Sequence, residues 1–158
     1  MNKNKNACSD NNIEYLCKTK CNNVPPYWDK VFEIKNIMDT RNDIDYIYWL
    51  DSDAFLLNFN YSKFIDFLNV NNAFSMIISE DMPPWEEIEF NAGAFIIKNN
   101  DKGKKIITKW ISCYNKDKWT YNEIQNAWTC SSRWAGHDYE QGAFIKYILN
   151  QETYKNDI

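Results

Sequence analysis

Apolar and polar positions along the chain predict strands that alternate with helices. Continuous apolar runs of strand length are typical of strands covered on both faces, and apolar residues spaced three and four apart are typical of helices. The predicted strands are 13–16, 44–50, 73–79 and 90–98, and the predicted helices are 25–38, 61–68, 106–114 and 139–149. This alternation predicts an α/β fold with a mostly parallel sheet flanked by helices.

Two stretches break the pattern and are predicted to be loops. Residues 80–87 are acidic and contain Pro83 and Pro84, and residues 116–137 are rich in Trp. Gly93 lies in the middle of the predicted strand 90–98, where a glycine commonly marks a bulge or the close approach of a ligand. Both observations point to the loop end of the sheet as a binding region.

The strand 44–50 leads directly into two acids, Asp51 and Asp53. Open α/β sheets bind ligands in the crevice at the carboxyl ends of their strands. While the backbone stays extended, residues two apart point to the same side, so both carboxylates could face one cation. Mg²⁺ and Mn²⁺ prefer oxygen ligands and often bind one or two carboxylates together with phosphates. The sequence therefore predicts a site for a metal-bound diphosphate.

Composition narrows the class of protein. The chain has 158 residues, which suits one domain over 1–158, and it is 44% apolar and 25% charged. Its aromatic content of 16%, with seven Trp, favours a binding cleft. The net charge of -4 and the scattered Lys and Arg argue against a nucleic-acid partner.

The cysteines and the apolar runs bear on the compartment. The five Cys are odd in number and match no zinc pattern, so reduced, partly buried thiols are expected. No stretch has the length of a transmembrane segment, and the polar start shows no signal peptide. We therefore expect a cytoplasmic protein, with a lumenal domain separated from its anchor as the alternative.

Four segments, spread over most of the chain, occur in an order that is specific when taken together. They are YWDKV at 27–31, WLDSDA at 49–54, FNAGAFIIKN at 90–99 and YEQGA at 139–143. An isolated acid-x-acid triplet is weak evidence, whereas the whole set is fairly specific. On these residues the chain resembles the GT-A fold glycosyltransferases, and most of all the α-galactosyl/xylosyltransferase group.

The resemblance implies a role for each matching segment. The acids would hold Mn²⁺ or Mg²⁺ on the diphosphate of a UDP-linked sugar, which the enzyme would transfer with retention to a glycan or a protein-linked sugar. The implied residues are Asp51, Ser52 and Asp53 at the cofactor, Asn91, Ala92 and Gly93 along the substrate cleft, and Glu140 and Gln141 near the reacting anomeric carbon. Trp85 and His137 are further candidates for the substrate site.

Several readings of these candidates stay open. Glu140 could be a nucleophile, an electrostatic stabiliser or an exposed residue in the first turn of a helix. Asn91 could satisfy backbone groups, and His137 is either a substitute metal ligand or a plain loop residue. The first strand and a later His of the resembled family have no counterpart here, so we expect a fold shortened at both ends.

Two other functions compete with glycosyl transfer. A non-catalytic module that binds nucleotide sugars or glycans would keep the same fold and the same site. A magnesium-dependent phosphatase of the haloacid-dehalogenase type would also place two acids after a buried strand. The phosphatase leaves the segments around Asn91 and Glu140 without a role.

Overall fold

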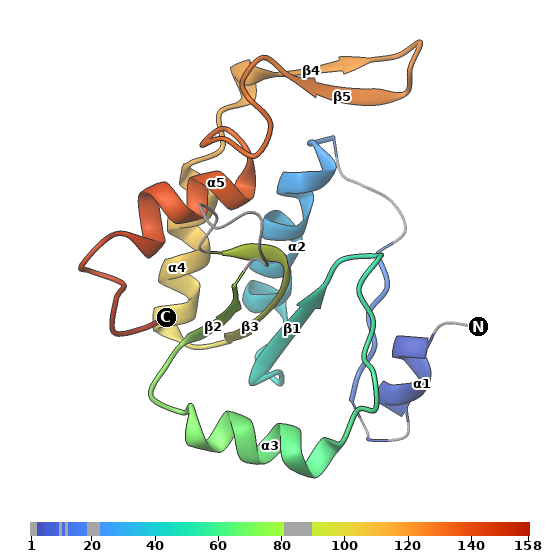
Figure 1. Ribbon diagram of the computed structural model, residues 1–158, viewed down its shortest axis with the longest axis vertical. Coiled ribbons are helices and arrows are strands. Elements are labelled where there is room, and N and C mark those ends of the chain that lie inside the picture. The colour runs from blue at the N-terminus through green and yellow to red at the C-terminus, as the bar shows by residue number, and fades with distance from the viewer. Residues whose placement is uncertain (1–2, 10, 12, 19–22, 81–89) are drawn as a thin grey trace.

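The computed structural model describes residues 3–9, 11, 13–18, 23–80 and 90–158 (Figure 1). The helices are α1 Lys3–Ser9, α2 Pro26–Thr40, α3 Tyr61–Val70, α4 Asp101–Ser112 and α5 Glu140–Phe144. The strands are β1 Tyr46–Leu50, β2 Met76–Ser79, β3 Asn91–Lys98, β4 Trp119–Asn122 and β5 Ala127–Cys130. The fold is mixed α/β, as predicted.

The central sheet has three strands in the order β1-β3-β2, and β3 runs antiparallel to both neighbours. The prediction of a mostly parallel sheet is therefore wrong for the described residues. β1 and β2 do run in the same direction, with α3 between them in sequence, but β3 lies between them in space (Figure 1). A parallel return usually needs a crossover helix, and no helical pattern occurs in the sequence between β2 and β3.

The segment 13–16, predicted as a strand, pairs with no strand. Ion pairs hold this part of the chain instead: Arg41 lies 2.7 Å from Glu14, and Lys18 lies 3.1 Å from Asp29. Its apolar residues were too few to distinguish a strand from extended backbone.

One region after α4 also differs from prediction. The predicted loop 116–137 contains a hairpin of β4 and β5, which projects at the top of Figure 1. Its turn includes Asn126, a residue type that tolerates the left-handed conformation, at φ 50°. The predicted helix 139–149 is confirmed over 140–149, where α5 continues directly into a π-helix at Ile145–Leu149.

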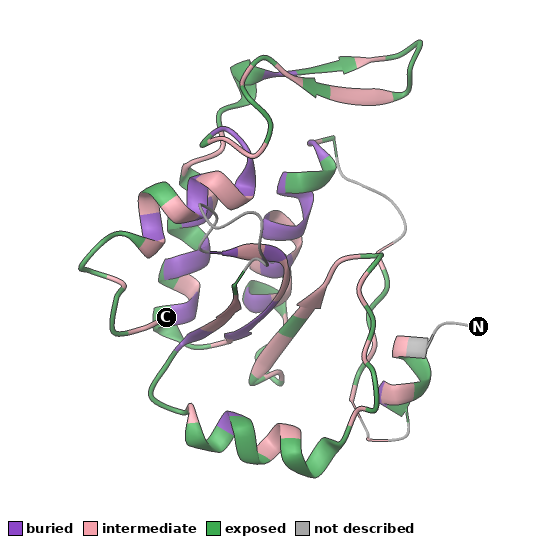
Figure 2. Cartoon of the chain, viewed as in Figure 1, coloured by how far each residue is buried: buried purple, intermediate pink, exposed green. Residues whose placement is uncertain are grey.

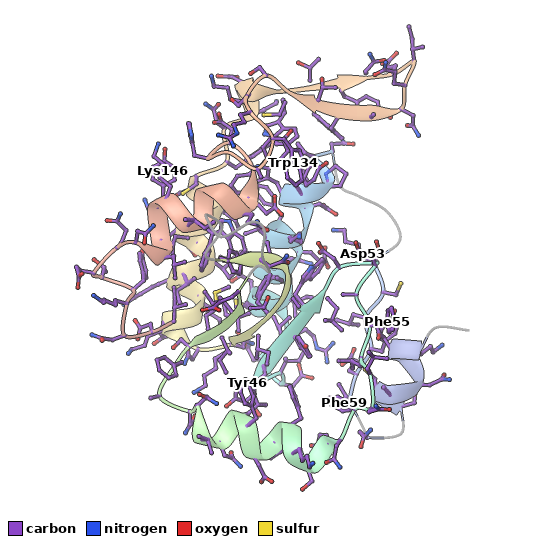
Figure 3. The ribbon with its side chains drawn as sticks, in the orientation of Figure 1. Tyr46, Asp53, Phe55, Phe59, Trp134 and Lys146 are labelled. Atoms are coloured by element: carbon purple, nitrogen blue, oxygen red, sulfur yellow. The ribbon has the colours of Figure 1, made fainter. Side chains whose placement is uncertain are left out.

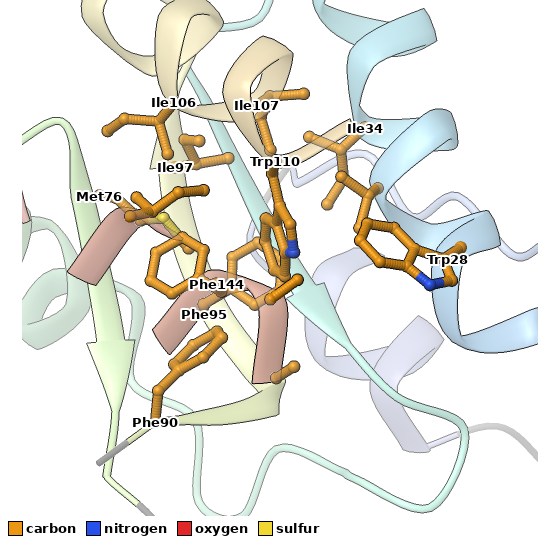
Figure 4. Close-up of a cluster of buried hydrophobic side chains, with 14 of the residues drawn as sticks. Trp28, Ile34, Met76, Phe90, Phe95, Ile97, Ile106, Ile107, Trp110 and Phe144 are labelled. Carbon is orange, nitrogen blue, oxygen red and sulfur yellow. The ribbon is translucent and has the colours of Figure 1, made fainter. Parts of the chain in front are cut away.

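The core lies between one face of the sheet and helices α2, α4 and α5 (Figure 2). Trp110 of α4 is fully buried, and its ring centroid lies 4.6 Å from that of Phe144 and 5.6 Å from that of Phe95 (Figure 4). Aromatic pairs at such separations add stability beyond the area that they bury. This packing joins β3, α4 and α5 into one unit.

The opposite face of the sheet is less well covered. Of the residues of α3, only Leu68 is buried, and an apolar cavity of about 420 Å³ lies between α3 and the sheet. Tyr48, Phe64 and Ile96 are among its lining residues. None of the described residues that line this cavity is an acid, so they do not match the chemistry that the sequence predicted.

The described cysteines and helices show two further features. Cys8, Cys17, Cys113 and Cys130 are free thiols, and Cys21 lies outside the described residues. Among the described helices, none is both long enough and apolar enough to cross a bilayer.

A close approach between α4 and β3 gives a test of the packing. A Cβ added at Gly103 would lie 2.0 Å from the backbone oxygen of Lys98, which is far inside contact distance. Alanine is the better helix former by about 1 kcal/mol, yet Gly103→Ala should lower the free energy of unfolding by about 1–3 kcal/mol. Urea unfolding would measure the loss. Lys105→Ala, at an exposed position of the same helix, should change stability little, and a neutral or stabilising Gly103→Ala would contradict the packing.

Candidate active site

A cavity of about 400 Å³ lies where β1 ends and β3 begins. It brings together most of the residues that the sequence singled out: Asp51, Asp53, Asn91, Ala92, Gly93, Glu140 and Gln141. The rest of its wall comes from the first turn of α2 and from the segment that leads to α5. Residues from four separate parts of the chain therefore converge on one site.

Lys30 of α2 lies at the centre of this arrangement and is buried. Its ammonium is 2.9 Å from each carboxylate oxygen of Asp51, 3.3 Å from Oε1 of Glu140 and 3.1 Å from the carbonyl oxygen of Ala92. A buried cation needs partners of this kind, because it has lost its hydration. Lys30 thereby joins the end of β1, the start of β3 and the start of α5.

Sequence reasoning missed Lys30 as a site residue, although a signal was present. Lys30 lies one helical turn before Ile34, which is fully buried, and so it falls on the inward stripe of α2. A lysine on that stripe is unusual, since unpaired charges are rarely buried.

The backbone turns sharply at the acids after β1. The backbone N–H of Ala54 donates to the carbonyl of Asp51 at 3.0 Å, so residues 51–54 form a turn and not the extended continuation that the sequence suggested. Asp51 and Asp53 nevertheless line the same cavity. Ser52 is exposed and is not part of the wall.

The two carboxylates have different surroundings. Asp51 is about one-third exposed and accepts a hydrogen bond from the indole N–H of Trp49 at 2.7 Å, in addition to its contacts with Lys30. Trp49 is half-buried and packs against the core. Asp53 is exposed and lines the cavity.

The floor of the cavity is formed by the first residues of β3. The side chain of Asn91 accepts from the backbone N–H of Gly93 at 2.8 Å. A Cβ at Gly93 would lie 2.8 Å from the Asn91 side-chain oxygen and 3.6 Å from Oδ2 of Asp51. The lack of a side chain at Gly93 therefore makes room for the side chain of Asn91 at the start of β3.

Glu140 and Gln141 begin α5 and have different roles in the packing. Glu140 is buried, and burial raises the pKa of its carboxyl, while the nearby Lys30 acts in the opposite direction. The side-chain oxygen of Gln141 accepts from the backbone N–H of Ala92 at 2.9 Å, which ties α5 to β3. Glu140 is thus not the exposed first-turn residue that was one alternative.

Three indole N–H groups hold the backbone just before and at Glu140. Trp28 and Trp119 donate to the carbonyl of Asp138 at 2.9 and 3.3 Å, and Trp110 donates to the carbonyl of Glu140 at 2.7 Å. These bonds are buried, and each satisfies both a Trp side chain and a backbone group. The position of Glu140 is therefore fixed from three directions.

The remaining candidates lie elsewhere or outside the described residues. His137 is about half exposed, lies 3.7 Å from Asp138 and is not among the residues that line the cavity. Trp85 falls within 81–89, outside the described residues. Tyr27 and Trp134 do line the cavity, although neither was among the site residues expected from sequence.

The residues present fit a divalent metal that is shared with a diphosphate. Within the described residues, no three side chains of His, Cys, Asp or Glu gather as a metal cage. Asp51 and Asp53 offer carboxylate oxygens, and such ions commonly take one or two carboxylates and complete their shell with phosphate and water. Since Lys30 shares Asp51, Asp53 is the more accessible ligand.

Two acids at the end of a strand and a buried acid line one cavity of this α/β protein, an arrangement typical of a small-molecule binding site. The profile of the galactosyl transferase GMA12/MNN10 family matches residues 2–156, and the chain belongs to this family of GT-A type glycosyltransferases. The protein is therefore an enzyme of the glycosyltransferase class, as the resemblance implied, and the phosphatase alternative loses its support. A search of curated proteins found no match.

Replacing Lys30 tests the central ion pairs. Lys30→Met keeps most of the apolar stem of the side chain but leaves Asp51 and the buried Glu140 without their cation. We expect a loss of about 3–5 kcal/mol in the free energy of unfolding, measured by urea, because an uncompensated buried charge is costly. Lys35→Met, the same change on α2 at a partly exposed pair with Asp39, should cost less than about 1 kcal/mol. Equal losses in the two variants would contradict the central role of Lys30.

The raised pKa of Glu140 predicts a pH dependence of stability. The folded protein holds this proton more tightly than the unfolded chain, so the contribution of Glu140 is most favourable below its ordinary pKa of 4.5 and declines as pH rises through the raised value. The unfolding free energy of Glu140→Gln relative to wild type should therefore increase from pH 4.5 upward. Glu152→Gln, at an exposed acid, should show no such trend, and a trend of the opposite sign would contradict the burial effect.

Proposed function

We propose that this glycosyltransferase moves a sugar from a UDP-linked donor to a glycan or protein-linked sugar, with retention at the anomeric carbon. The observation that carries the proposal is the cavity in which Asp51 and Asp53 share a wall with the buried Glu140. Family membership supports glycosyl transfer in general. The donor, the acceptor and the stereochemistry belong to the proposal.

The carboxylates after β1 serve the leaving group in this proposal. Asp51 and Asp53 would hold Mn²⁺ or Mg²⁺, which when bound supplies positive charge for the departing diphosphate. Lys30 holds the side chain of Asp51 in place, since its ammonium contacts both carboxylate oxygens. Asp53 is exposed, so its carboxylate is accessible to the ligand.

Glu140 serves the sugar. When the sugar–phosphate bond breaks, the bonding electron pair leaves with the diphosphate and the anomeric carbon becomes electron-poor. A carboxylate beside that carbon stabilises it, either by its charge or by forming a covalent bond. Both roles require the charged form of Glu140: the contact with Lys30 acts in its favour, while burial acts against it and raises the pKa of this carboxyl.

Nucleotide binding tests the first half of the proposal. UDP with Mn²⁺ at a hundredfold excess over its dissociation constant should stabilise the protein by about 2.7 kcal/mol in thermal unfolding. Asp53→Asn should remove the Mn²⁺-dependent part of this stabilisation, while Asp66→Asn, at an exposed acid of α3, should retain it. An unchanged Mn²⁺-dependent shift in Asp53→Asn would contradict the assignment of the metal ligand.

Turnover of the donor tests the second half of the proposal, the role of Glu140 in the reaction. Hydrolysis of UDP-galactose, UDP-glucose and UDP-xylose by the wild-type protein would be followed by release of UDP, with water as the acceptor. Glu140→Gln should lower this rate by about a hundredfold or more and leave the binding of UDP nearly unchanged. Equal rates in the wild type and the variant would remove Glu140 from the reaction. Binding of UDP-sugars without any turnover would instead favour the non-catalytic module.

A further inference from the structure

Trp134 is an exposed indole at the rim of the candidate active site. Its relative exposure is 67%, although it is one of the residues that line the cavity. The other Trp residues near it behave differently, since Trp28, Trp110 and Trp119 are buried. A side chain of this size normally gains stability by burial, so an exposed indole beside a polar cavity indicates a surface for a ligand.

The turn that carries Trp134 is tightly held. Ala135 has a φ of 57°, and the backbone N–H of Gly136 donates to the carbonyl of Arg133 at 3.1 Å. Helix α5 packs directly against this turn, because a Cβ at Gly142 would lie 2.5 Å from the carbonyl oxygen of Ala135. The backbone around Trp134 is therefore positioned before any ligand arrives, which lowers the entropic cost of binding.

The surroundings of the indole select the chemistry of the ligand. A flat aromatic face accepts either the C–H face of a sugar ring or a nucleobase. Polar groups near it, including Glu140 and Asn91, offer acceptors for sugar hydroxyls. An aromatic face and several acceptors for hydroxyl groups occur together in this cavity. A sugar ring can therefore form more favourable contacts with the lining residues than a base can.

The place of Trp134 in the chain separates acceptor from donor. Trp134 belongs to the segment that leads to Glu140, whereas Asp53, the expected diphosphate ligand, follows β1 on a separate part of the ribbon (Figure 3). A base is joined to the diphosphate and extends away from the reacting bond, whereas an acceptor must reach the reacting carbon. We propose that Trp134 is the platform on which the sugar ring of the acceptor stacks. The inference rests on the proposed function for the roles of Glu140 and Asp53.

Direct sugar binding tests this platform without depending on turnover. Saturation-transfer NMR and calorimetry would use methyl glycosides and linear trisaccharides of glucose, galactose, mannose and xylose as probes. Trp134→Ala should weaken the best-binding saccharide by about tenfold or more, a factor that corresponds to about 1.4 kcal/mol. Trp134→Phe should recover most of the affinity because it keeps an aromatic face. Trp128→Ala, at a half-buried Trp of the hairpin that does not line the cavity, serves as the matched control.

Parallel measurements separate this inference from the proposed function. The affinity for UDP with Mn²⁺ should fall much less in Trp134→Ala than the affinity for the saccharide does. A loss of UDP affinity with intact saccharide binding would overturn the inference in favour of a base platform. Saccharide binding that is unchanged in Trp134→Ala, or the absence of binding by every saccharide of the panel, would also overturn it. If the wild type bound no nucleotide but bound saccharide through Trp134, the proposed function would be wrong. The inference that Trp134 binds a sugar ring would still hold.

Discussion

The ammonium of Lys30 is the interaction on which the site depends. It is buried among oxygens of Asp51, Ala92 and Glu140, which belong to three distant parts of the chain. Without this cation, the end of β1 and the start of α5 would present two carboxylates to each other in a poorly solvated space. Like charges in such a place repel strongly, so the cavity could not close around them. Lys30 neutralises part of this charge and leaves an excess that a metal or the hydroxyls of a sugar can use.

A second constraint acts through tryptophan. The chain is rich in this residue, and in the structure several Trp side chains hold the backbone near the site. Trp28, Trp110 and Trp119 come from α2, α4 and β4, and their indole N–H groups all donate to backbone carbonyls near the start of α5. Each indole ring packs in the core, and its N–H group holds the backbone near Glu140. The same three residues therefore contribute to the hydrophobic core and fix the position of Glu140.

The apolar pattern was sufficient to find the main elements. The spacing around Trp28 predicted α2, that around Trp110 predicted α4, and the acids after β1 were expected at the carboxyl end of a strand, where they are found. Apolar periodicity reports which residues are buried, so it works best where burial decides the structure. The family resemblance then linked Asp51 to Glu140, which no local pattern could do.

Other features could not be obtained in this way. Strand direction depends on connections and not on the apolar content of a strand, so the antiparallel course of β3 was missed. The β4–β5 hairpin was missed because each strand has only four residues, which is too short for an apolar pattern to identify a strand. Lys30 was missed as a site residue because a lysine is read as a surface residue until its partners from elsewhere in the chain are known.

The indole bonds near α5 have a consequence for how this scaffold can diverge. They end on main-chain oxygens, which every amino acid supplies, and not on the side chains at 138 or 140. Substitution at those two positions therefore removes none of the three bonds, although the Asp138 side chain accepts from Ser132 and the Glu140 side chain pairs with the buried Lys30. The acid that lines the cavity at 140 can accordingly be exchanged by a single mutation while these main-chain bonds persist.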